Sequence, residues 1–146
     1  QFKWLTFRDM RGMSKEEFSK VLGESCVSVW VDRISSFGTY PLESMMCGTP
    51  VIGVLPTMKP EWLTKENGIW SQDETTIVGT ISNFMKNWLE DSLPEELYKS
   101  MESTPKTYSV EKEMSSVLAY FEKLVTEKVA EFEASINKLK PVEENI

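Results

Sequence analysis

The chain has 146 residues, of which 40% are hydrophobic and 27% are charged, and its net charge is −7. This length and apolar content fit one globular domain with a buried core and exclude a disordered chain, while the acidic balance argues against a nucleic-acid partner. The sequence holds no histidine, which excludes His-based catalysis and most zinc sites.

The chain opens on a predicted strand and a helix. Residues 2–7 alternate large apolar side chains with other residues, which is typical of a strand. A loop follows. Ser14 then begins a helix, because Glu17 three residues later completes a capping box, and Gly23 ends it.

Two further strands flank a short helix. Residues 26–31 and 49–54 are rich in apolar and β-branched side chains, as in parallel strands covered on both faces. Between them the sequence predicts a polar turn over 32–39 and a helix over 40–47, which Gly48 stops.

A long loop over 55–67 and a short extra strand at 68–70 come next. Asp73 is then placed to cap a helix. The apolar stripe of this helix comprises Ile77, Ile81, Phe84, Met85, Trp88 and Leu89.

Two more helices are predicted toward the end of the chain. Ser92 and Glu95 form a second capping box, which opens a helix to about Met101. A long helix begins at Ser109 and ends before Pro141. Its apolar positions are Met114, Val117, Leu118, Phe121, Leu124, Val125, Val129, Phe132, Ile136 and Leu139. No internal repeat is evident along the chain.

The elements suggest two parts, an α/β domain over 1–108 and a long helix with an acidic tail over 109–146. The long helix could pack onto its own sheet up to Leu124. Beyond that point a small domain can hardly cover it, and it could dock on another domain or self-associate with a second copy.

Cys26 and Cys47 lie in apolar surroundings and form no disulfide framework, so we expect buried free thiols in a reducing compartment. No apolar run reaches the length of a membrane span and no signal peptide is visible, which favours a cytoplasmic location.

Alternation of strands and helices predicts an α/β fold with a Rossmann-like parallel sheet and flanking helices. Three strands are firmly indicated, whereas a doubly wound sheet usually has five or six. The chain does not begin with Met and opens almost at once on a strand-like run. We therefore expect upstream strands in a longer protein.

Ligands of open parallel sheets bind beyond the carboxyl ends of the strands, which here means the loops 32–39 and 55–67. In the first loop Gly38 allows backbone to approach a ligand closely, and the amides of Gly38, Thr39 and Tyr40 face an anion at the helix start. Glu43, one turn later, could accept from the hydroxyls of a ribose, or it is an ordinary carboxylate favoured by the helix dipole.

The second loop offers Glu61 and the pair Asn67-Gly68 as its polar features. Loops of this length are often functional. An Asn-Gly pair is also a common way of closing a turn, so both interpretations stay open.

Residues 36–53, SFGTYPLESMMCGTPVIG, resemble a segment of the retaining glycosyltransferases with the GT-B fold. In that family, the group 1 superfamily of glycogen synthase-like and sucrose synthase-like enzymes, the segment reads E-G-F-G-x-P-x-L-E-A-M-A-C-G-x-P-V-I. The pairs Pro60-Glu61 and Asn67-Gly68 resemble the family's later P-E and N-G, and residues 22–31 resemble its preceding strand. The resemblance covers roughly residues 2–88 and implies the C-terminal, nucleotide-sugar-binding domain of a GT-B fold.

The resemblance assigns roles to individual residues. Glu43 matches the second glutamate of the family's Glu-x7-Glu motif, which contacts the ribose. The first glutamate, which lies against the transferred sugar, falls at Ser35, and Asp32 is the nearby carboxylate that could compensate. The nucleotide-sugar-binding set, in which the turn's amides meet the sugar hydroxyls and the diphosphate, is Phe37, Gly38, Thr39, Tyr40 and Glu43. No Arg/Lys pair matching the family's phosphate contacts is identifiable.

The implied activity is transfer of a sugar from a nucleotide sugar to an acceptor hydroxyl with retention of configuration, without a metal or cofactor. The resemblance implies an N-terminal acceptor domain as partner and a place on the cytoplasmic side, peripheral to the membrane. By itself this chain would be inactive. The alternative is a non-catalytic scaffold or subunit that keeps the fold and has lost the sugar-side carboxylate. No G-x-G-x-x-G follows a strand, which disfavours an NAD-dependent enzyme.

Overall fold

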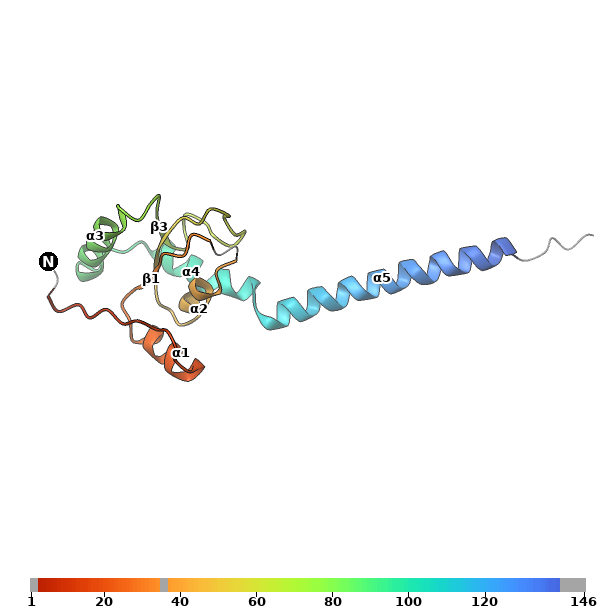
Figure 1. Ribbon diagram of the computed structural model, residues 1–146, viewed down its shortest axis with the longest axis horizontal. Helices are drawn as coiled ribbons and strands as arrows, with labels where there is room; N and C mark the ends of the chain where they lie inside the picture. Colours follow the sequence, from red (N-terminus) through yellow and green to blue (C-terminus); the bar gives the residue numbers. More distant parts are fainter. Residues whose placement is uncertain (1–2, 35–36, 140–146) are drawn as a thin grey trace, which may run out of the picture. The chain divides into compact units, whose positions relative to one another are not determined.

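The computed structural model describes residues 3–34 and 37–139 (Figure 1). The chain divides into two compact units, Gln1–Thr107 and Tyr108–Ile146. The boundary expected from the sequence lies one residue later. The first unit contains the sheet and four helices among the residues described, and the second contains one long helix.

The first unit is built on a parallel sheet. Over the described residues its strands are β1 (Ser28–Trp30), β2 (Val51–Val54) and β3 (Ile69–Ser71), in the spatial order β1-β2-β3. Val29 pairs with Ile52, and Ile52 pairs with Ile69. The α/β class with parallel strands, expected from the alternation of elements, is confirmed. Strands β1 and β2 are shorter than their apolar runs, and β3 begins one residue later than predicted.

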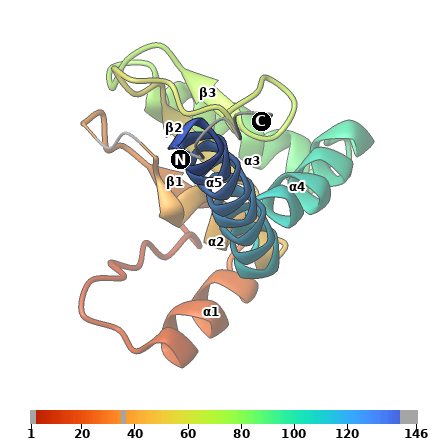
Figure 2. The ribbon, with the colours of Figure 1, turned by 90° about the vertical axis from the view of Figure 1, so that its right-hand side faces the viewer.

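Helices cover both faces of the sheet. Helix α2 (Thr39–Met46) packs on one face and α3 (Ile77–Leu89) on the other (Figure 1). Helix α4 (Glu95–Thr107) lies beside α2 (Figure 2), and α1 (Lys15–Gly23) also contacts α2. Helix α2 therefore stands at the centre of one side of the unit.

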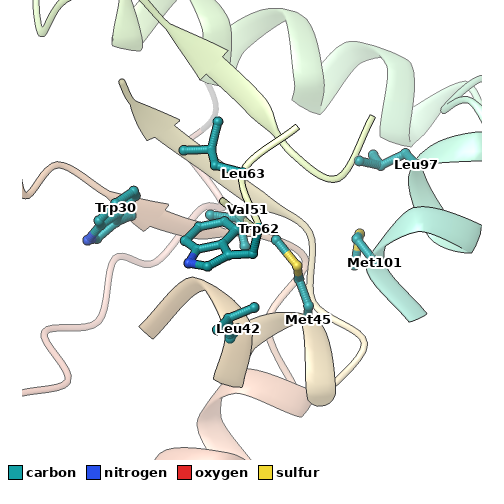
Figure 3. Packing of buried hydrophobic residues seen from close by; sticks show 8 residues of the cluster. All are labelled: Trp30, Leu42, Met45, Val51, Trp62, Leu63, Leu97 and Met101. Atoms are coloured by element: carbon teal, nitrogen blue, oxygen red, sulfur yellow. The ribbon is translucent and has the colours of Figure 1, made fainter. Parts of the chain in front are cut away.

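Alternate side chains of the strands contribute to two apolar cores, because successive residues of a strand point to opposite faces of the sheet. The core on the α2 side comprises Trp30, Leu42, Met45, Val51, Trp62, Leu63, Leu97 and Met101 (Figure 3). The core on the α3 side comprises Ile52, Val54, Ile77, Phe84 and Met85. Burial on both faces explains why the strands read as nearly continuous apolar runs.

Local signals place the ends of the first two helices. The Ser14 hydroxyl accepts from the Glu17 amide at 3.2 Å, and the Glu17 carboxylate accepts from the Ser14 amide at 3.0 Å. The predicted capping box is confirmed. Helix α2 ends just before Gly48, which has a φ of +75°, as expected of a glycine that stops a helix.

The strand predicted at residues 2–7 is wrong where the structure describes it. Lys3 and Trp4 form a turn, and residues 5–10 are irregular. Leu5 packs on the core beside α3, while Phe7 is 76% exposed. Alternation alone does not make a strand, because a strand also needs a neighbouring backbone with which to exchange hydrogen bonds.

Helix α3 begins later than predicted. The Asp73 carboxylate accepts from the amides of Thr75 and Thr76 and so caps a turn, and the N-cap of α3 is Thr76. Trp88 and Leu89, expected on the buried stripe, are 40% and 56% exposed. The stripe outruns the short strands on which α3 packs.

The second predicted capping box does not form. The Ser92 hydroxyl donates to the carbonyl of Asn87, at the end of α3, instead of capping α4. Helix α4 starts at Glu95, two residues later than a cap at Ser92 would place it, and runs to Thr107, through Pro105. Pro105 is buried, and it removes only one hydrogen bond in the last turn of the helix.

The second unit is helix α5 (Val110–Leu139). The Ser109 hydroxyl accepts from the Lys112 amide at 3.3 Å, which confirms Ser109 at the start of the helix. Along the described part of α5 the apolar side chains are exposed, apart from Leu124, which is half-buried. Among the residues described, no helix has both the length and the apolarity that crossing a membrane requires.

Candidate functional site

The turn from β1 into α2 is the centre of the site predicted from the sequence. Gly38 occupies the N-cap of α2 in the left-handed region, with φ +69° and ψ +73°. Amides in the first turn of a helix lack partners within that helix, so Thr39 and Tyr40 present donors at the carboxyl edge of the sheet. Thr39 and Glu43 both lie on the exposed face of α2, one turn apart.

Gly38 is required here for a packing reason that the sequence does not reveal. It is buried, and a Cβ atom at this position would lie 2.8 Å from Cζ2 of Trp30 and 3.3 Å from Cζ2 of Trp62. The side of Gly38 expected to admit a ligand is thus filled by two indole rings. Any ligand at the turn must approach from the opposite, exposed side.

Three tryptophans pack against one another in the core next to this turn. The ring centroids of Trp30, Trp62 and Trp70 lie 6.0 to 6.3 Å from one another. Figure 3 shows Trp30 and Trp62 on the side of the sheet where α2 lies. Sequence reasoning missed this cluster, because its members come from two strands and a loop far apart in the chain.

The long loop after β2 closes onto this turn. The Trp62 indole N–H donates to the carbonyl of Phe37 at 2.6 Å, and the Thr57 amide donates to the carbonyl of Arg33 at 3.0 Å. The two loops predicted to meet at the carboxyl edge of the sheet are therefore joined directly. Arg33 also forms an ion pair with Glu74, at 3.3 Å, before α3.

Asn67 anchors the far end of the same loop. Its side chain is fully buried; the amide nitrogen donates to the carbonyl of Trp62 at 2.5 Å and to the hydroxyl of Thr104 at 3.2 Å, and the amide oxygen accepts from the Thr64 amide. Asn67 is therefore a structural residue that ties the loop to α4. Glu61, the other polar feature of the loop, is exposed.

Two of the remaining predicted residues, Tyr40 and Asp32, have hydrogen-bond partners outside α2. The Tyr40 side chain turns away toward α1, where its ring lies edge-on to Phe18 at 5.9 Å and its hydroxyl donates to the sulfur of Met10. Burial raises the pKa of Tyr40. Asp32 is exposed and accepts from the Ile34 amide at 3.0 Å, while Ser35 lies outside the described residues.

The described cavities do not coincide with the turn. One hollow, of about 340 Å³, lies between the N-terminal segment, α1 and β1, and Tyr40 is the predicted site residue on its wall. In the part of the chain that the structure describes, no group of His, Cys, Asp and Glu side chains could hold a metal ion.

The two thiols are free, as expected, but they are half-buried and not fully buried. Burial raises the pKa of Cys26 and Cys47, and the neighbouring Glu43 carboxylate raises that of Cys47 further.

The chain matches no family model, no curated protein and no solved structure in the three comparisons made. The likeness to the glycosyltransferases thus rests on the residues of the turn and the strands around it.

Proposed function

We propose that this chain is the donor-binding part of a retaining glycosyltransferase of the GT-B type and that a nucleotide sugar binds at the turn between β1 and α2. The main support for this proposal is that Gly38 lies at the start of α2 and Glu43 lies one turn later, on the exposed face of the helix. This is the order that the family's motif requires, with amides for the diphosphate and a carboxylate for the ribose.

The parallel sheet supports this proposal. Ligands of Rossmann-like sheets bind at the carboxyl edge of the strands. At this edge the loops after β1 and β2 are joined by the hydrogen bond from Trp62 to Phe37, next to Gly38. Arg33, paired with Glu74, supplies a positive charge at the same edge, where it can meet a phosphate.

The chemistry would be mainly electrostatic. Breaking the bond between the sugar and the diphosphate develops negative charge on the leaving oxygen, and preorganised amides at the start of α2 stabilise that charge. The bond to the acceptor oxygen forms on the same face of the sugar, so the configuration is retained, and the proton of the acceptor hydroxyl passes to the leaving diphosphate oxygen. The acceptor would come from another domain of the same enzyme, bound to this one as its partner. We propose a cytoplasmic location, peripheral to the membrane, for that enzyme.

A non-catalytic scaffold is the second candidate. One observation favours it: Trp30 and Trp62 fill the space beneath Gly38 with apolar side chains. The residue at the sugar-side position is Ser35, which carries no charge. A domain of this kind keeps the fold and presents its surfaces to other proteins.

Calorimetric titration of the full chain with UDP-, GDP- and ADP-sugars tests the first candidate. We expect one of these donors to bind, and Glu43→Ala to weaken its binding at least tenfold, because the ribose hydroxyls lose their acceptor. Glu16→Ala, which removes an exposed carboxylate from α1, is the matched control and should bind as the parent does. No heat with any donor, from well-folded protein, would contradict the proposal.

Ser35→Glu separates the two candidates. If the site binds a donor sugar, restoring the carboxylate should strengthen binding of the sugar nucleotide relative to the corresponding nucleoside diphosphate, because only the former carries the sugar hydroxyls. A scaffold should show no such difference.

A further inference from the structure

The hollow between the N-terminal segment, α1 and β1 is lined mainly by apolar side chains, and we call it the first hollow. Its volume is about 340 Å³. Pockets that hold small molecules have volumes of about 300 Å³ and more. Several half-buried apolar residues lie on its wall: Leu5, Val21, Val27, Val29 and Ile81. Each is partly exposed to water, so a ligand with an apolar body would be stabilised by covering them.

A second hollow, of about 350 Å³, shares part of this wall. Four residues line both hollows: Arg8, Met10, Val29 and Tyr40. Two charged residues, Asp9 and Arg11, line only the second hollow, whereas the Glu24 carboxylate lines only the first. The positive charge around the two hollows is therefore gathered on the side of the second.

Arg8 is the unpaired positive charge at this position. The chain has three arginines. Arg11 forms an ion pair with Asp9, and Arg33 forms one with Glu74. Within residues 3–34 and 37–139, Arg8 has no ion-pair partner. A guanidinium carries parallel N–H donors that match the two oxygens of a carboxylate, so Arg8 is suited to bind one beside the apolar wall.

The Tyr40 hydroxyl is a second donor on the shared wall. It donates to the sulfur of Met10 at 3.9 Å, and a thioether sulfur is a weak acceptor. A carboxylate oxygen is a stronger acceptor, so a bound carboxylate would replace the sulfur in this hydrogen bond. Burial raises the pKa of Tyr40, which keeps the hydroxyl protonated and able to donate at neutral pH.

Size and charge together define the ligand. A cavity of about 150 Å³ holds one benzene molecule, so the first hollow has room for roughly ten carbon atoms. The net charge of −7 repels multiply charged anions, and one guanidinium neutralises one negative charge. We propose that the two hollows form one binding site for a medium-chain carboxylic acid, with its apolar chain in the first hollow and its carboxylate between Arg8 and Tyr40.

Calorimetric titration of the full chain with octanoate tests whether this ligand binds. We expect one octanoate to bind per chain. Octanol has the same apolar chain without the carboxylate and should bind at least tenfold more weakly. Acetate has the carboxylate without the chain and should give no measurable heat. Equal binding of octanoate and octanol, or no heat from octanoate with well-folded protein, would overturn the proposal.

Substitutions of the two donors test where the carboxylate lies. Arg8→Gln should weaken octanoate binding at least tenfold and leave octanol binding unchanged, because only the carboxylate uses the guanidinium. Tyr40→Phe keeps the ring and should weaken octanoate binding at least threefold. Lys20→Gln is the matched control, because it removes one positive charge from an exposed position of α1 that lines neither hollow. Equal weakening by Arg8→Gln and Lys20→Gln would show a general effect of charge and reject the site.

The two cysteines locate the apolar chain of the ligand without any substitution. Cys26 lines the first hollow, whereas Cys47 lines neither hollow, and both thiols are half-buried. Saturating octanoate should slow the alkylation of Cys26 by N-ethylmaleimide at least threefold and leave that of Cys47 unchanged, as measured by mass spectrometry of the peptides. Unchanged alkylation of Cys26, or equal slowing at both thiols, would contradict the proposed position.

This site is separate from the proposed donor site. Gly38 and Glu43 line neither hollow. Glu43→Ala should therefore bind octanoate as the parent protein does, whether or not a nucleotide sugar binds at the turn before α2. A failure of octanoate binding would likewise leave the donor proposal untouched.

Discussion

The indole nitrogen of Trp62 lies 2.6 Å from the carbonyl oxygen of Phe37. This hydrogen bond connects the long loop after β2 with the turn before α2, across 25 residues of sequence. Because Trp62 is only 2% exposed, its N–H has no access to water if the bond is lost. The conformation of the proposed donor site is therefore coupled to the core beneath it.

Trp62→Phe should lower the free energy of unfolding by about 1–3 kcal/mol, since it removes the donor and leaves the Phe37 carbonyl without it. Trp62→Ala should cost more, about 3–5 kcal/mol, because it also opens a cavity. Trp88→Phe, at a half-exposed indole on α3, is the control and should cost least. Urea denaturation followed by fluorescence measures all three, and equal effects of Trp62→Phe and Trp88→Phe would contradict the assignment.

Substitution of three glycines by alanine separates the energetic cost of a strained backbone from the cost of a steric clash. Gly38→Ala combines a positive φ with a clash against Trp30 and should cost about 2–4 kcal/mol. Gly12→Ala has a positive φ but open space around it and should cost about 1–2 kcal/mol at most. Gly79→Ala, in α3 with open space, should stabilise by about 0.5–1 kcal/mol. A Gly38→Ala cost no larger than that of Gly12→Ala would show that the indoles move aside easily.

Asn67→Ala should destabilise the α/β unit by about 2–3 kcal/mol, because it leaves the Trp62 carbonyl and the Thr64 amide without their partner. Thr104→Val, which removes one acceptor of the Asn67 amide, should cost less. Chemical denaturation of both variants tests this order. A larger loss in the free energy of unfolding from Thr104→Val than from Asn67→Ala would contradict this role of Asn67.

Stability should fall in alkaline solution. Burial raises the pKa of Tyr40 above its ordinary value of 10.0 and the pKa of Cys26 above 9.0, so the unfolded chain ionises first. The native state then binds more protons than the unfolded state, and the free energy of unfolding falls as the pH rises beyond about 9. Tyr40→Phe removes the phenol and should make the fall between pH 9 and 11 shallower. Denaturation midpoints measured across this pH range test the prediction. Equal losses of stability with rising pH in Tyr40→Phe and in the parent protein would contradict it.

Local features of the fold were predictable from the sequence. The capping box at Ser14 and the stop at Gly48 depend on a few neighbouring residues, and the apolar runs at β1 and β2 reflect burial on both faces. Such signals are contained within one element. They were sufficient to predict a parallel α/β unit and the position of Gly38 at the start of a helix.

Features that depend on distant contacts were not predictable. Residues 3–7 alternate like a strand but find no strand partner, and Ser92 bonds to the end of α3 instead of capping α4. Gly38 was read as space for a ligand, whereas Trp30 and Trp62 fill one side of it. In each case the outcome is set by residues many positions away, which no local pattern records.

The burial of Asn67 beside Gly68 also affects the chemical ageing of the protein. In flexible chains an Asn-Gly sequence deamidates readily, because the glycine amide nitrogen attacks the asparagine side chain and forms a succinimide. Here the side-chain amide is held by Trp62 and Thr104, so the attack must wait until the loop separates from α4. Deamidation of Asn67 adds one negative charge to the protein. The rate at which this charge appears would therefore report how often the loop separates from α4.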